Sequence, residues 1–220
     1  VTGPLGYNLT KQGVGNETLV FDDLIAGSYT VQETSSGMEW EVVVGTIEAS
    51  VISGQTTEVS FTNNLIPGSL EVTKEFLLPD GQLVNVGDID ADFNFEINVV
   101  GPLGYNSTKS GVGNETLLFE NLPVGTYTVQ ETSSGIQWEV AVGSQETTVI
   151  SGQTTEITFS NNYIPGQLEV TKKFMFNDQM VYVGDLDADF NFEISVTGPL
   201  GYNLTKQGVG NETLVFDDLI

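Results

Sequence analysis

A repeat of 98 residues is the feature that most constrains how this chain can fold. The hexapeptide GPLGYN begins at Gly3, Gly101 and Gly198, at spacings of 98 and 97 residues. The segments QETSSG, SGQTTE and IPG-x-LEVTK each occur twice, also 98 residues apart. Self-similarity at a fixed period indicates that one structural unit is strung several times along the chain.

The boundaries between units are best placed at two Ile-Pro-Gly joints, at residues 66–68 and 164–166. Proline and glycine interrupt strands, and a three-residue joint leaves little slack between neighbours. The sequence then divides into the C-terminal part of one repeat (1–66), a complete repeat (67–165) and the N-terminal part of the next repeat (166–220). We expect both ends to cut through repeats of a longer polypeptide.

The repeats also suggest a longer period. Residues 1–25 and 196–220 are identical, whereas the middle copy differs from them at seven positions. This pattern is consistent with two alternating repeat types in a unit of 195 residues.

The composition argues against several classes of function. With 6 lysines, no arginine and 30 acidic residues, the net charge is -24, whereas nucleic-acid partners require clustered cations. The absence of cysteine and histidine removes thiol nucleophiles, disulfides, the usual zinc sites and any Ser-His-Asp triad. No apolar run reaches the roughly 18 residues of a membrane span, so we expect no membrane insertion in this segment.

Alternating polarity predicts an all-β fold of tandem immunoglobulin-like β-sandwiches. Short strands with period-2 alternation are separated by Gly, Asn and Pro turns, and no segment has a convincing helical period. The residues expected to point inward within the complete repeat are Leu70, Val72, Phe93, Phe95, Ile97, Val99, Tyr127, Val129, Trp138, Val140, Val142, Ile157 and Phe159.

On three strands of the complete repeat, the inward row ends in a polar side chain. These are Lys74, Glu131 and Asn161. The partial repeats carry Glu33 and Asn63, and then Lys172, at the matching places. A buried charge must be compensated by a partner, so the alternation leaves open an ordinary Lys-Glu salt bridge capped by asparagine.

The residues that carry these rows resemble a known family. The segments GSLEVTK (68–74), F-x-x-L-x-x-G-x-Y-x-V-x-E (119–131) and FSN (159–161) are similar to the CnaB-type, prealbumin-like repeats of bacterial surface adhesins and pilins. The resemblance implies that a first-strand lysine bonds covalently to a last-strand asparagine with the help of a central acid.

Carried over to this chain, the resemblance implies an isopeptide bond in each repeat. Lys74 and Asn161 would be joined, with Glu131 as the promoting acid. Glu33 and Asn63 would serve the preceding repeat and Lys172 the following one. The reaction would occur once per domain, so the chain is not expected to be an enzyme. Alternation points Asn64 and Asn162 outward, which makes them poorer cross-linking partners.

Two weaker patterns remain. Asp88, Asp90 and Asp92 resemble the start of a calcium loop, but no glycine follows Asp92 and Val99 stands where such a loop has glutamate. The alternative is a solvated acidic stretch, and no other cofactor is expected. Six Asn-x-Ser/Thr sequons are candidate glycosylation sites in turn-rich segments: Asn8, Asn16, Asn106, Asn114, Asn203 and Asn211.

Together these features predict a structural protein rather than a catalyst. We expect an extracellular stalk or fibre at the cell surface, whose partners are neighbouring repeats of the same chain and other copies in a fibre. Two alternatives stay open at this point. The repeats could themselves bind collagen or glycan as an adhesin, or the chains could bundle laterally into a surface filament.

Overall fold

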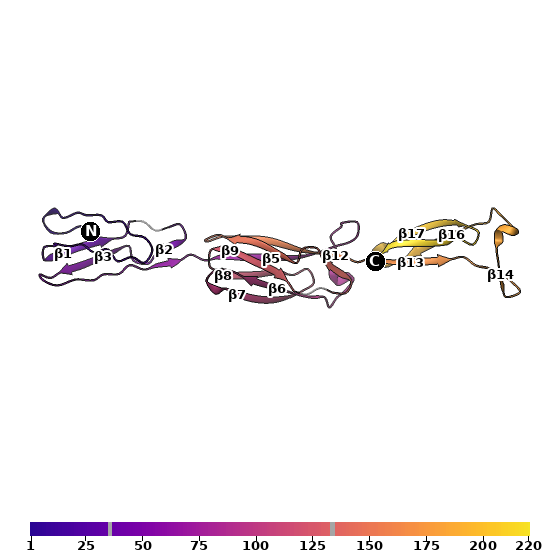
Figure 1. Ribbon diagram of the computed structural model, residues 1–220, viewed down its shortest axis with the longest axis horizontal. Helices are drawn as coiled ribbons and strands as arrows, with labels where there is room; N and C mark the ends of the chain where they lie inside the picture. Colours follow the sequence, from indigo (N-terminus) through magenta and orange to yellow (C-terminus); the bar gives the residue numbers. More distant parts are fainter. Residues whose placement is uncertain (35–36, 133–134) are drawn as a thin grey trace. The chain divides into compact units, whose positions relative to one another are not determined.

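The computed structural model describes residues 1–34, 37–132 and 135–220 (Figure 1). In this part of the chain, the regular structure consists of β-strands and five short 3-10 helices, without an α-helix. The predicted all-β class is therefore confirmed. None of the described helices has the length and apolarity needed to cross a membrane.

The strands are β1 (Gly27–Gln32), β2 (Trp40–Val42), β3 (Thr46–Val51), β4 (Asn63–Leu65), β5 (Gly68–Leu77), β6 (Asn94–Val100), β7 (Asn106–Val112), β8 (Thr116–Leu122), β9 (Gly125–Glu131), β10 (Trp138–Val140), β11 (Ser144–Val149), β12 (Thr154–Tyr163), β13 (Gly166–Thr171), β14 (Phe174–Phe176), β15 (Gln179–Val181), β16 (Asn191–Thr197), β17 (Asn203–Val209) and β18 (Thr213–Leu219). The 3-10 helices are η1 (Pro4–Gly6), η2 (Val86–Asp88), η3 (Pro102–Gly104), η4 (Val183–Asp185) and η5 (Pro199–Gly201).

The chain divides into two compact units. The first comprises Val1–Ser69, Glu120–Gly125 and Thr148–Thr155, and the second comprises Leu70–Phe119, Thr126–Thr147 and Glu156–Ile220. The division by repeats at residues 67–165 follows the sequence period instead, and it stays a prediction.

Residues 68–163 build two four-stranded sheets (Figure 1). The strand orders are β10-β12-β5-β8 and β11-β9-β6-β7. Strand β6 runs antiparallel to both β7 and β9, and Ile97 lies opposite Lys109 on one side and Glu131 on the other. Strand β5 alternates strictly between buried and half-buried residues along its ten positions. Such alternation is typical of a strand with one face against a core, so the sandwich fold agrees with the sequence prediction.

The core of this sandwich contains most of the inward residues predicted from the sequence, together with Phe76 and others that were not predicted. Its fully buried side chains include Leu70, Val72, Phe76, Phe93, Phe95, Ile97, Val99, Tyr127, Val129, Trp138 and Phe159. Phe76 packs edge-on against both Phe93 and Trp138, with ring centroids 4.8 Å apart in each pair. One predicted inward residue is wrong, because β10 ends at Val140 and Val142 is 48% exposed beyond it.

The partial repeats contain the same pairings in two-stranded sheets. In residues 166–220, β13 pairs with β18 and β16 pairs with β17, and both pairs are antiparallel. In residues 1–66, β1 pairs with β3 and β2 pairs with β4. The short strands β14 and β15 form a separate antiparallel pair.

Candidate cross-linking site

The structure brings the three predicted polar residues of the complete repeat together inside the sandwich. Lys74 lies on β5, Glu131 ends β9 and Asn161 lies on β12. Lys74 Nζ is 3.1 Å from Glu131 Oε2, and Asn161 Nδ2 donates to Glu131 Oε1 over 3.1 Å. The three residues are 1%, 6% and 0% exposed. One carboxylate thus connects the first strand of the complete repeat to its last.

Burial controls the electrostatics of this cluster. Desolvation lowers the pKa of Lys74 below the usual lysine value, although the Glu131 carboxylate opposes that shift by attraction and hydrogen bonding. The ring of Phe76 lies 4.9 Å from Lys74 Nζ. The lysine is therefore held in a dry, aromatic environment in which the neutral amine becomes more accessible than in water.

The amide of Asn161 is only partly satisfied. Its Oδ1 atom is buried and has no hydrogen-bond partner among the described residues, while its Nδ2 atom donates to Glu131. The two ends of an asparagine amide differ by a half-turn, so the opposite orientation would place the carbonyl oxygen against the Glu131 carboxyl group. A protonated Glu131 could then donate to that oxygen.

The partial repeats reproduce those parts of the cluster that they contain. In the first segment, Asn63 Nδ2 donates to Glu33 Oε1 over 2.8 Å. Glu33 Oε2 and Asn63 Oδ1 are buried without a described partner. In the last segment, half-buried Lys172 has its Nζ 5.2 Å from the ring of Phe174. Glu33 and Asn63 are therefore neighbours, as their positions in the sequence predicted, and the cross-linking roles of Glu33, Asn63 and Lys172 remain predictions.

Sequence reasoning missed the aromatic neighbour of the lysine. Phe76 and Phe174 each stand two positions after the lysine on the same face of the strand. The alternation that identified Lys74 would also have placed Phe76 beside it, because residues i and i+2 share a face. The outward direction predicted for Asn64 and Asn162 agrees with their exposure.

The side chains of Asp88, Asp90 and Asp92 are not gathered into one cluster in the described structure. Among the described residues, no three Asp or Glu side chains gather in a way that could hold a metal ion. Asp88 ends η2, and the backbone oxygen of Asp92 accepts a hydrogen bond from Asn94. Asp90 lies between them, where its backbone N–H donates to the Val86 carbonyl.

The two sequons of the complete repeat differ in their hydrogen bonds. Asn114 Oδ1 accepts from the Val86 N–H over 2.8 Å, and Asn114 Nδ2 donates to the Val84 carbonyl over 3.0 Å. Asn211 makes the equivalent pair of bonds to residues 183 and 181. In the other sequon, Asn106 Oδ1 accepts from Asn98 over 2.8 Å. The second sequon therefore carries a loop-anchoring asparagine, whether or not any of the six is modified.

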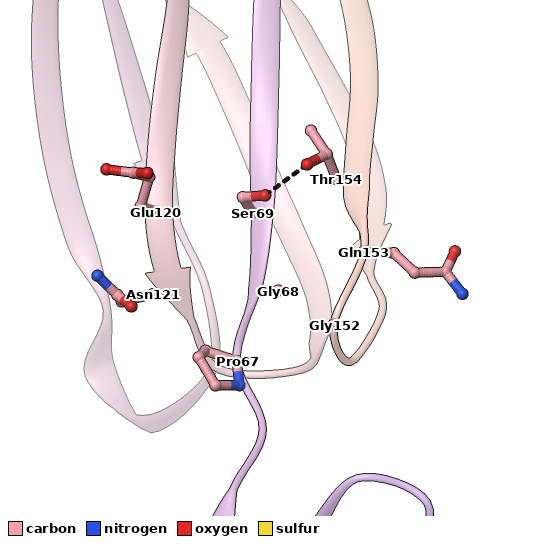
Figure 2. A pocket seen from close by; sticks show the side chains of 8 residues that line it. All are labelled: Pro67, Gly68, Ser69, Glu120, Asn121, Gly152, Gln153 and Thr154. Carbon is pink, nitrogen blue, oxygen red and sulfur yellow. Dashed lines mark hydrogen bonds between the residues drawn. The ribbon is translucent and has the colours of Figure 1, made fainter.

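A shallow, polar pocket lies at the start of β5 (Figure 2). Its lining residues are Pro67, Gly68, Ser69, Glu120, Asn121, Gly152, Gln153 and Thr154. The hydroxyls of Ser69 and Thr154 are hydrogen bonded at 2.8 Å (Figure 2). Glu120 is the one ionisable side chain in this lining, so the pocket lacks a paired acid and base for catalysis.

Comparison with known proteins yields one family and several solved structures. The model of a family described as a domain of unknown function (DUF5979) matches residues 70–164. A search of curated proteins finds no match to this chain.

The solved structures that are similar to the chain include two pilins and a further bacterial protein. The minor pilin GBS52 of Streptococcus agalactiae is 13% identical with a TM-score of 0.38, covering 66% of this chain and 64% of the pilin. The TIE protein of Bacillus anthracis is 17% identical with a TM-score of 0.44, covering 90% of this chain and 36% of that protein. A streptococcal ancillary pilin is 14% identical with a TM-score of 0.33, covering 89% of this chain and 64% of the pilin. The chain thus spans less than two thirds of each of these proteins.

Proposed function

We propose that this chain is a structural segment of an extracellular surface stalk or fibre, and that each complete repeat is braced by an isopeptide bond between its first and last strands. The observation that carries the proposal is the buried contact of Glu131 with both Lys74 and Asn161. A charged pair in a sandwich core destabilises the fold more than apolar side chains of similar size would. A permanent covalent link would offset that cost and would explain why a charged cluster is buried in the core.

The bond would form by proton transfer followed by acyl transfer. The Lys74 ammonium gives a proton to Glu131 across their 3.1 Å contact, which leaves a neutral amine and a neutral acid. The amine nitrogen then attacks Asn161 Cγ while Glu131 donates a hydrogen bond to the amide oxygen. The Cγ–Nδ2 bond breaks, Glu131 relays the proton lost by the amine to the departing nitrogen, and one ammonia leaves. Burial supplies the positioning that makes this single event fast enough.

In this proposal, the partners of the segment are neighbouring repeats and further copies of the chain in the fibre. A net charge of -24 keeps such chains soluble and mutually repelling. Covalent bracing gives each repeat a load-bearing path between its ends, which is the property that a stalk at a cell surface needs.

The intact mass of the purified, folded chain tests the proposal. Because the chain contains one complete Lys-Glu-Asn cluster, we expect a mass deficit of one ammonia relative to the sequence. The Glu131→Gln and Lys74→Ala variants should show the full sequence mass. Glu139→Gln is the matched control, since Glu139 is an exposed glutamate on β10, and it should retain the deficit. Full sequence mass for the folded parent protein would refute the cross-link.

A further inference from the structure

Two consecutive strands leave open edges on one side of the sandwich. Strands β7 and β8 follow each other in the chain, yet β7 ends the sheet β11-β9-β6-β7 and β8 ends the sheet β10-β12-β5-β8 (Figure 1). Open edges expose unpaired N–H and C=O groups that can pair with another chain. In a protein with near-identical repeats, each copy supplies strands that suit the edges of the others.

A lysine on β7 bridges these two edges. Lys109 lies opposite the buried Ile97 in the β6–β7 register, so its side chain starts on the inward face of the edge strand. Its ammonium donates to the backbone carbonyl of Leu118 on β8 over 2.5 Å. The same nitrogen lies 5.1 Å from the ring of Phe119. The lysine therefore spans from the edge of one sheet to the edge of the other.

The contact of this lysine with a backbone carbonyl recurs in all three copies of the sequence, although residues 9–26 of the first copy form no strand. In the first segment, the Lys11 ammonium donates to the Val20 carbonyl and lies 5.2 Å from a phenylalanine ring. In the last segment, Lys206 donates to the Val215 carbonyl over 2.6 Å and lies 5.5 Å from the equivalent ring. Three recurrences of one geometry argue that the contact is a built feature of the repeat.

The strand register in the last segment shows that the Val215 carbonyl, which accepts from Lys206, faces the open edge of the sheet. The Lys172 N–H donates to the Glu212 carbonyl, and these two residues continue the β13–β18 register one step beyond its last pair, Thr171 and Thr213, so they form a hydrogen-bonded pair. In an antiparallel ladder, such pairs alternate with non-bonded pairs. Val215 lies three positions further along, opposite Glu169, and therefore belongs to a non-bonded pair. Its carbonyl therefore points away from β13, toward the side of β18 on which an incoming strand would bind.

The opposite side of the sandwich has side-chain bridges of its own. Gln145 Nε2 on β11 donates to the Thr158 carbonyl on β12 over 2.6 Å. Thr155 Oγ1 on β12 donates to the Thr148 carbonyl on β11 over 3.0 Å. Strands β11 and β12 are also consecutive but belong to different sheets. Strand β11 is an edge strand, whereas β12 lies between β10 and β5, and β10 pairs only with Asn161–Tyr163 of β12. Thr158 lies outside that pairing, so on this side too a side chain of the same repeat occupies a backbone acceptor.

We propose that the β7 lysine closes the sandwich edge and prevents strand pairing with a second copy of this chain. An added strand gains its affinity from main-chain hydrogen bonds to the edge. An ammonium on the edge carbonyl occupies an acceptor that an added strand would otherwise use. A second copy is the relevant competitor, because residues 1–25 and 196–220 are identical and the middle copy is nearly so.

The test compares the full 220-residue chain with its Lys109→Met variant by light scattering after size exclusion, over a range of concentrations. Methionine keeps an apolar stem beside Phe119 and removes the donor. We expect at least a twofold rise in weight-average mass over the parent protein. Lys109→Arg retains a donor and should keep the parent mass. Lys173→Met removes one charge from an exposed lysine and should also keep it.

The change in net charge alone predicts that Lys109→Met associates less than the parent protein. Removing a cation from a chain of net charge -24 increases mutual repulsion, so a rise in mass cannot come from simple electrostatics. Tryptophan fluorescence during urea unfolding, to which the buried Trp138 contributes, verifies that Lys109→Met remains folded. If Lys109→Met does not fold, Lys109→Gln, which keeps a shorter N–H donor, takes its place in the test. Its weight-average mass should lie between that of the parent protein and the twofold rise expected for Lys109→Met. A folded variant with the parent mass at every concentration, or equal association of Lys173→Met, would overturn the proposal.

Discussion

At the scale of single residues, the chemistry of the repeat depends on how one carboxylate shares two partners. Glu131 accepts from Lys74 and Asn161 inside a core that is otherwise apolar. Removing one member of a buried ion pair leaves the other charge uncompensated, whereas removing both can be nearly neutral. The cluster should therefore respond to single and double substitutions in different ways.

The first prediction uses Asn161→Ala, which blocks the cross-link but leaves the ion pair in place. In that background, Lys74→Met should lower the free energy of unfolding by about 3–5 kcal/mol, because Glu131 is left buried and unpaired. Adding Glu131→Leu should restore most of the loss. Urea unfolding provides the measurement. If the triple variant is no more stable than the Asn161→Ala/Lys74→Met pair, the ion-pair account fails.

The second prediction concerns pH in the same background. Burial lowers the pKa of Lys74 in the folded state, so at pH values between that pKa and 10.5 the unfolded chain binds more protons than the folded one. Stability then rises with pH across this window. Relative to Asn161→Ala/Lys74→Met, the Asn161→Ala protein should gain stability as the pH increases from neutral to about 10. A constant or falling difference between the two unfolding curves would contradict the sign.

The polar cluster could be predicted from the sequence because alternation fixes the face of each residue. Lys74 follows Leu70 and Val72 at steps of two, and no tertiary information is needed to place it inward. The bridge from Lys109 to Leu118 could not be predicted in this way. It depends on the two strands joining different sheets and on which carbonyl the register leaves free, and both are tertiary properties.

At the scale of elements, the repeated GPLGYN turn depends on the close packing of a glycine and on a leucine with a positive φ. Gly101 lies so close to the Tyr127 ring that an added Cβ would be 2.1 Å from a ring carbon. Two positions after Gly101, Leu103 has a φ of 55° and is 88% exposed. Leu5, the equivalent residue of the first copy, has a φ of 56° and is 90% exposed. The composition of this segment could not predict a leucine in the left-handed region, which leucine rarely adopts.

The third prediction is that Gly101→Ala destabilises the complete repeat. The methyl group would force the buried Tyr127 ring to move, and overpacking of this kind typically costs about 1–3 kcal/mol. Gly143→Ala is the matched control, because an added Cβ there meets its nearest neighbour only at 3.8 Å. Thermal unfolding of both variants should show a lowered midpoint for the first alone. Equal midpoints would mean that the turn relaxes without disturbing the core.

At the scale of the whole molecule, the cross-link would change how the repeat carries load. Lys74 and Asn161 lie on strands at opposite ends of the repeat's sequence, and these strands belong to one sheet. Joining them would close a loop of roughly 88 residues, which by analogy with disulfides stabilises the fold by about 4–5 kcal/mol. Tension applied at the two ends would then pass through a covalent bond, and the residues between the linked positions would be shielded from extension.

The fourth prediction follows for single-molecule stretching of the full chain. A strand of about 3.3–3.6 Å per residue gives the loop between the linked positions a length of about 300 Å. When the parent protein is stretched until it detaches, its extension should therefore show no step of about 300 Å. Glu131→Gln, which cannot form the bond, should release it, and Glu139→Gln should behave like the parent. Because the partial repeats are the same in all three proteins, their extension cancels in the comparison. A step of this length in the parent protein would show that the sandwich bears load through packing and hydrogen bonds alone, since only an unlinked loop can extend.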